Sequence, residues 1–207
     1  MLFICNYCLR PPEEIIGDDA PNCLRCGRPM VRATLSYKGF WMSPNFVISR
    51  MQKIVATYGI RLAQSCRCFK REREAWAAAL WALGLNESQG YEHWVEIETE
   101  EGTPDTKVHR LDQSTGHNII QTYNIEIADW EEHVDDLMEI IQKKCERAYP
   151  SDFGLLIHGR SGKTINPDAV IAAVREIKRV PFAEIWMVGR ALEDLNRVQM
   201  VCFHPNM

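Results

Sequence analysis

The sequence contains no long hydrophobic run. Its longest uninterrupted apolar stretch, Ala75 to Leu83, is far too short to cross a bilayer, which needs about 20 residues. The first residues, MLFICNYCLRPP, lack the basic flank and small-residue cleavage site of a secretory leader. Low-complexity tracts are also absent. A chain of 207 residues with this make-up indicates one or two ordinary globular domains. We therefore expect a cytoplasmic protein with no membrane partner.

Several common catalytic signatures are missing as well. The six histidines form no HxxH or HExxH spacing, no Ser-His-Asp or Cys-His arrangement stands out, and there is no GxGxxG. The segment from Gly159 to Thr164 resembles a phosphate-binding P-loop, but the first glycine of that motif would fall at Ile157. We interpret the segment as a loop between a strand and a helix.

Four N-terminal cysteines stand in a spacing typical of a zinc site. Cys5 and Cys8 form one CxxC pair, and Cys23 and Cys26 form a second after a polar, turn-rich loop. Two such tight turns can aim four thiolates at one ion, which makes a closed, structural Zn²⁺ site without an open catalytic position. Gly27 follows the second pair, where such a turn often needs a positive φ. The alternatives are disulfides, which the cytoplasm disfavours, and coincidental buried cysteines, for which four at this spacing would be unusual.

Charge is distributed unevenly along the chain. The net charge is −4, yet residues 1–71 carry eleven Lys and Arg against four Asp and Glu. A basic front on an acidic body predicts contact with a polyanion, DNA or RNA. The candidate nucleic-acid-binding residues are Arg50, Lys53, Arg67 and Lys70, with aromatic residues such as Tyr58 between them. The other interpretation is that the aromatic residues are core and the charges are a solvated face.

The remaining chain alternates between helical and extended patterns. We expect a zinc-ribbon-like module over 1–32, a basic connecting region over 33–69, and an α/β domain over 70–207 with a mixed sheet flanked by helices. Gly84 is predicted to stop the first helix of that domain, and Asp129 to cap the second through a capping box with Glu132. The predicted elements are a helix at 70–85, strands at 93–101, 106–111 and 118–128, a helix from 130, a strand at 152–159, a helix from Pro167, and strands at 182–189 and 198–204.

The two strands that flank the predicted turn at Asp112–Gly116 carry the candidate active site. Asp105 stands at the head of the first strand, on the same face as Lys107, and Glu126 lies near the end of the second. A hairpin that brings two carboxylates together near a lysine can hold a divalent metal against a phosphate. The alternative is that Pro104-Asp105 only opens a turn and that Glu126 lies on an ordinary exposed face.

The order of elements, together with Pro104-Asp105 and Glu126-Ile-Ala128, resembles the PD-(D/E)xK superfamily of restriction-endonuclease-like folds. The resemblance covers roughly residues 70–205. It implies that Asp105 and Glu126 bind a divalent metal, usually Mg²⁺. The activating lysine of the family would fall at Ala128, which is a departure. A lysine from elsewhere is tolerated in the family.

Two sources could supply that lysine: Lys107, or Lys143 and Lys144. Lys143 and Lys144 lie some four turns along the next helix, a distance that argues against them. Glu72 or Glu74 from the first helix is the candidate for a third acid.

Two functions follow. The first is a zinc-containing, metal-dependent nuclease that uses Asp105, Glu126 and Lys107. The second is a catalytically inactive nucleic-acid-binding or assembly subunit of a larger complex, motivated by Ala128 and the basic front. A protein-interaction module with no nucleic-acid role is a third option that the sequence leaves open.

Overall fold

The computed structural model describes most of the chain from Trp41 onward. The described residues are 2–4, 13–14, 22, 26–28, 31–32, 41–97, 102–112, 119–131, 136–160, 165–190 and 198–205. Three short N-terminal strands form a small antiparallel sheet in the order β2-β1-β3: β1 (Leu2–Ile4), β2 (Glu13–Glu14) and β3 (Val31–Arg32). Gly27 has φ +67°, the positive value predicted for the turn after Cys26.

Seven strands form the main sheet, in the order β10-β9-β8-β7-β6-β5-β4. The pairs β7–β8 and β8–β9 are parallel, and all the others are antiparallel. The strands are β4 (Trp41–Met42), β5 (Glu92–Ile97), β6 (Thr106–Asp112), β7 (Ile119–Trp130), β8 (Phe153–Gly159), β9 (Glu184–Arg190) and β10 (Val198–His204). The expected mixed, partly parallel sheet is therefore confirmed.

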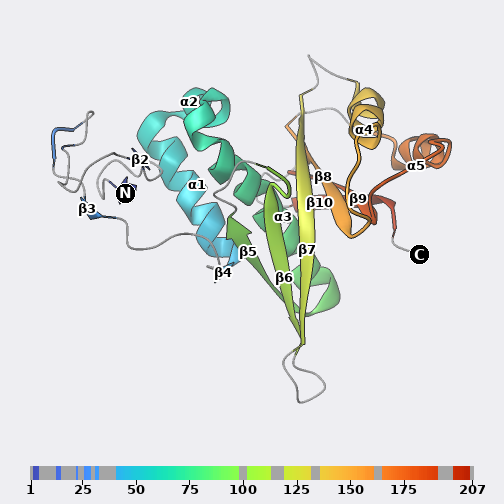
Figure 1. The fold of residues 1–207 in the computed structure, drawn as a ribbon, viewed down its shortest axis with the longest axis horizontal. Helices are drawn as coiled ribbons and strands as arrows, with labels where there is room; N and C mark the ends of the chain where they lie inside the picture. Colours follow the sequence, from blue (N-terminus) through green and yellow to red (C-terminus); the bar gives the residue numbers. More distant parts are fainter. Residues whose placement is uncertain are drawn as a thin grey trace.

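Helices cover both faces of this sheet (Figure 1). In the described part they are α1 (Pro44–Tyr58), α2 (Ile60–Ser65), α3 (Lys70–Gln89), α4 (Leu137–Cys145) and α5 (Pro167–Arg175), with a 3₁₀ turn at Arg67–Phe69. One core cluster joins α3 to one face through Trp81, Ile125 and Leu156. A second joins α4 and α5 to the opposite face through Ile141, Leu155 and Phe203. No helix in the described residues is long and apolar enough to cross a membrane.

Residues 41–69 belong to the same packed unit as the sheet. β4 pairs with β5, with Trp41 opposite Glu96, and α1 packs along α3. Ser43 caps α1 by accepting a hydrogen bond from the amide of Phe46, and Gly59 ends the helix. The region predicted only as a basic connection therefore contains a capped helix.

Two predicted helix boundaries are wrong. Helix α3 continues through Gly84 to Gln89 and ends at Gly90, which has φ +73°. Gly84 instead lies where a Cβ would collide with the side chain of Met200 on β10, so its missing side chain serves close packing. Asp129 does not cap a helix, because β7 runs on to Trp130 and Asp136 caps α4.

Candidate functional site

Asp105 is fixed where β6 leaves the sheet. Pairing of β6 with β7 begins at Thr106 opposite Ile125, whereas β7 continues to Trp130 beside β8. The amide of Asp105 donates to the carbonyl of Ile125 at 3.0 Å, and the amide of Ile127 donates to Asp105 Oδ2 at 2.9 Å. The Asp105 carboxylate thus replaces a missing strand partner. Asp105 bonds the residues on both sides of Glu126, so the two acidic residues lie on adjacent segments of main chain.

The second carboxylate oxygen of Asp105 faces the start of α3. Lys70 Nζ and Arg71 Nη1 each lie 3.7 Å from Asp105 Oδ1. The same two cations bond Glu74, Lys70 at 2.9 Å and Arg71 at 3.0 Å. Burial raises the pKa of Glu74 and the charge of Asp105 adds to this, although the hydrogen bond from Lys70 opposes both effects. Glu74 is therefore the helical acid beside Asp105, whereas Glu72 pairs with Arg50 at 3.2 Å.

Glu126 lies on the opposite face of β7, toward α4. Its Oε1 accepts a 2.5 Å hydrogen bond from Lys144 Nζ and a 3.1 Å bond from the Tyr149 hydroxyl. Burial and the negative charge of Glu126 raise the pKa of Tyr149, so this hydroxyl stays protonated and donates. Within the described residues, Glu126 Oε2 is buried and has no hydrogen-bond partner. Such an atom calls for a partner, either water or an ion.

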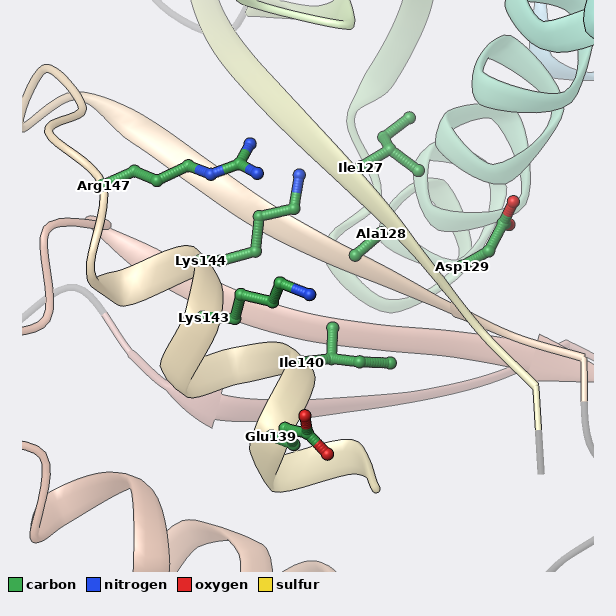
Figure 2. A pocket seen from close by; sticks show the side chains of 8 residues that line it. All are labelled: Ile127, Ala128, Asp129, Glu139, Ile140, Lys143, Lys144 and Arg147. Atoms are coloured by element: carbon green, nitrogen blue, oxygen red, sulfur yellow. The ribbon is translucent and has the colours of Figure 1, made fainter. Parts of the chain in front are cut away.

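Lys144, and not Lys107, is the lysine found at Glu126. Lys107 was predicted to share a face with Asp105, but the Asp105 carboxylate turns toward α3. Lys107 instead lies on the face of Glu126, where the strand register places it opposite Glu96 and Asn124. Lys144 lines a cavity of about 290 Å³ together with Ala128. Figure 2 shows Lys143, Lys144 and Arg147 pointing from α4 and the turn after it toward Ala128. The space that the small side chain of Ala128 leaves is thus approached by lysines from α4.

A second cavity of about 260 Å³ lies on the α3 side of β7. Ile127 and Asp129 line both cavities, so the two flank the same end of this strand. We call the basic residues around them the basic rim: Arg67, Lys70, Arg73, Lys143, Lys144 and Arg147. The acidic residues that line the same cavities are Glu74, Asp129 and Glu139. Cations therefore outnumber acids here, on a chain whose net charge is −4.

Asp129 belongs to an ion-pair cluster at this end of β7. It accepts from Arg160 Nη2 at 2.6 Å and lies 3.0 Å from Nδ1 of His158, whose ring is buried against Trp76. Burial alone would raise the pKa of Asp129, but the hydrogen bond to His158 and the charge of Arg160 lower it below its ordinary value. Asp129 therefore stays ionised. Arg160, in the segment that resembles a P-loop, is held by this carboxylate.

The four proposed nucleic-acid residues have different surroundings. Arg67 and Lys70 lie together in the basic rim. Arg50 instead bonds Glu72 and is only 20% exposed, and Lys53 is exposed on α1. Among the aromatic residues, Tyr58 packs against Phe69 in a small core cluster, as the alternative interpretation expects. Cys66 and Cys68 bond each other as a disulfide.

The predicted zinc ligands fall almost entirely outside the described residues. Cys5, Cys8 and Cys23 lie there, and Cys26 is exposed in the turn before Gly27. Among the residues that the structure describes, no group of three or more His, Cys, Asp or Glu side chains lies close enough to hold a metal. Asp105, Glu126 and Glu74 therefore do not converge as a three-acid metal shell. The two oxygens beside β7 that could take a ligand are Asp105 Oδ1, toward α3, and Glu126 Oε2, on the α4 side.

Tyr149, the Asp129–His158 pair, and Arg73 and Arg147 of the basic rim were not predicted from the sequence. The sequence signal for Lys144 was present, but the misplaced helix start made it seem too remote.

No protein-family model, curated protein or solved structure matches the chain.

Proposed function

We propose that the chain is a metal-dependent nuclease of restriction-endonuclease-like fold that acts on DNA or RNA and carries an N-terminal zinc module. The observation that supports this most directly is the environment of Glu126. One of its oxygens is held by Lys144, the other is buried without a partner among the described residues, and its neighbours in β7 bond Asp105.

The residues present fit a Mg²⁺ ion. This ion prefers hard oxygen ligands and is commonly held by one or two carboxylates, with water and substrate phosphate completing its shell. Glu126 would hold it, because Glu126 Oε2 is the orphaned atom that such a ligand would satisfy. Asp105 Oδ1 faces α3 on the other side of β7, so Asp105 would join the same shell only by turning its side chain. When bound, Mg²⁺ polarises a phosphoryl oxygen and lowers the pKa of an attacking water.

The chain's own residues supply the rest of the chemistry. Lys144 stands where it can both orient Glu126 and stabilise negative charge that develops on the phosphate. Tyr149 keeps Glu126 in place through its hydroxyl. The basic rim attracts the phosphate backbone and positions it along the end of β7. In this proposal Lys144 takes the role that the sequence first suggested for Lys107.

Metal binding is the first test. Calorimetry with Mg²⁺ and Mn²⁺ should show a site in the wild-type protein that is lost in the Asp105→Asn/Glu126→Gln double variant, with zinc retained in both. The titration is repeated with an oligonucleotide present, since phosphate can complete the metal shell. Identical binding in the two proteins would contradict the assignment.

Cleavage tests the role of Lys144. Lys144→Ala should reduce metal-dependent cleavage by roughly 100-fold, the loss typical of one charge-stabilising donor. Lys143→Ala is the matched control, because Lys143 lines the same cavity on the same helix and Glu126 is held by Lys144. A deficit of about threefold or less is expected there. Equal losses in the two variants would mean that the rim acts only through its summed charge.

The second candidate is an inactive nucleic-acid-binding subunit. The observation in its favour is that Lys70 and Arg71 already bridge Glu74 and Asp105, which neutralises these acids without a metal. This candidate expects salt-dependent oligonucleotide binding and no turnover with Mg²⁺ or Mn²⁺.

A further inference from the structure

A third cavity lies at the other end of the sheet, on the α3 face. Its volume is about 540 Å³, within the range of sites for small organic ligands. It opens beside the first residues of β8 and β9, where Gly154 and Glu184 line it. Glu126 and Ala128, in contrast, lie on the α4 face of β7. This cavity is therefore separate from the candidate active site.

Three aromatic rings line this cavity. Trp81 is 2% exposed, so it forms the floor, and Tyr123 and Trp186 are half-buried beside it. The Tyr123 ring stands at 90° to Trp81 with centroids 5.7 Å apart, and the Trp186 ring is inclined by 59° at 6.1 Å. Rings that meet at steep angles present faces in different directions, as in the aromatic cages that surround ammonium groups.

The charge of the lining favours a cation. Asp152 and Glu184 contribute two carboxylates, against one cation, Arg110. The Arg110 guanidinium lies 3.5 Å from the centroid of the Tyr91 ring and 3.4 Å from Asp112, and it also hydrogen-bonds Tyr123. With Arg110 counted, the lining keeps one net negative charge. Glu184 Oε2 accepts a 2.7 Å hydrogen bond from the Trp186 indole, which fixes the acid beside an aromatic face.

We propose that this cavity, formed by Trp81, Tyr123, Trp186, Asp152 and Glu184, binds an organic cation of the alkylammonium class. The aromatic faces would surround the alkylated nitrogen, and the carboxylates would balance its charge. A phosphate-bearing ligand would meet Asp152 and Glu184 and be repelled, so the cavity is not an extension of the nucleic-acid path.

Tetramethylammonium chloride is the probe, with sodium chloride at equal concentration as the reference. Binding is followed in the full chain by the indole ¹H–¹⁵N NMR signals of the tryptophans. The Trp186 signal is assigned as the one missing from Trp186→Phe. Saturable shifts of the Trp81 and Trp186 signals are expected, with the exposed Trp41 signal unmoved.

Glu184→Gln separates charge from shape. The glutamine retains a carbonyl oxygen that can accept from the Trp186 indole, so the ring stays in place while the charge is lost. We expect affinity for the probe to fall at least fivefold, and at least tenfold in Trp186→Ala. Trp41→Ala is the control and should bind as the wild type does.

Three results would overturn the proposal. These are shifts that sodium chloride reproduces, affinity that Glu184→Gln leaves unchanged, and tighter binding of AMP than of tetramethylammonium. The last result would identify the cavity as a site for a nucleobase. Because Glu184→Gln changes no packing volume, the test remains decisive even if Trp186→Ala fails to fold.

Discussion

Asp105 has a structural role and a chemical role, and two substitutions separate them. The structural role is the hydrogen bond from the Ile127 amide to Asp105 Oδ2, at 2.9 Å, which satisfies β7 where β6 has ended. Asp105→Asn keeps an oxygen that can accept this bond, whereas Asp105→Ala removes it. The amide of Ile127 lies in buried strand, so leaving it unpaired costs about 1–3 kcal/mol.

The charge of Asp105 contributes less to stability. Its cationic partners, Lys70 and Arg71, are 53% and 21% exposed, lie 3.7 Å away, and remain bonded to Glu74 in either variant. Loss of such an exposed ion pair changes stability by roughly 0–1 kcal/mol. We therefore expect Asp105→Asn to unfold in urea within about 1 kcal/mol of the wild type, and Asp105→Ala to be less stable by a further 1–3 kcal/mol.

Urea unfolding followed by circular dichroism at pH 7 measures both differences. Metal binding or cleavage should be lost in both variants alike, since each lacks the carboxylate. Equal stability of Asp105→Ala and wild type would refute the claim that this side chain stands in for a strand partner. It also follows that the alanine variant is a poor probe of catalysis, because it perturbs β7 beside Glu126.

Two further predictions concern pH and salt. His93 is 1% exposed, and burial lowers its pKa to about 4, so between pH 6.5 and 4 the unfolded chain binds a proton that the folded chain does not. The contribution of His93 to the free energy of unfolding should be constant above pH 6.5 and should fall by roughly 1–3 kcal/mol as the pH drops to 4. His93→Gln should lose most of that dependence in denaturant titrations, and an unchanged slope would contradict it. Arg67→Glu, in the basic rim, should weaken oligonucleotide binding and reduce the slope of log affinity against log salt by about 1 or more, whereas Lys53→Glu on α1 should change it less. Similar slopes for both variants would contradict the placement of the nucleic-acid path.

The element order of the domain was predictable because its hydrophobic periodicity is strong. β-Branched and aromatic runs located β6, β7 and β8, and the Asn166-Pro167 pair marked the start of α5. The parallel pairing of β7 with β8 followed from the helix between them. The pairing of β4 with β5 was not predictable, because two residues carry no periodic signal.

The wrong start predicted for the helix after β7 explains why Lys144 was thought too far from Glu126. Asp129 and Glu132 have the spacing of a capping box, so a helix seemed to begin just after Glu126. In the structure, β7 advances four residues beyond Glu126 to Trp130, roughly 13 Å. Helix α4 then begins at Leu137, and the seven residues to Lys144 return roughly 10 Å. The outward and return paths nearly cancel, and Lys144 arrives level with Glu126.

The distribution of charge in space could not be deduced from its distribution in sequence. The basic front was expected to meet nucleic acid as a unit, yet Arg50 is bonded to Glu72. The basic rim draws instead on Arg67 and Lys70 and on a distant segment around Lys143. The sequence of a segment gives the number of its charged residues, but the packing of the folded chain decides which of them lie on the same surface.

The change of pairing at β7 has a consequence for folding order. The strands on one side of it, β5 and β6, join β7 as an antiparallel meander with short connections, so their contacts close small loops. β8 and β9 pair in parallel and require a helical crossover each, which closes larger loops at a greater entropic cost. Topology of this kind favours early formation of the meander with α3, before the parallel strands dock. Asp105 would then be in place on β7 before α4 delivers Lys144, so the two halves of the candidate site would be completed at different stages of folding.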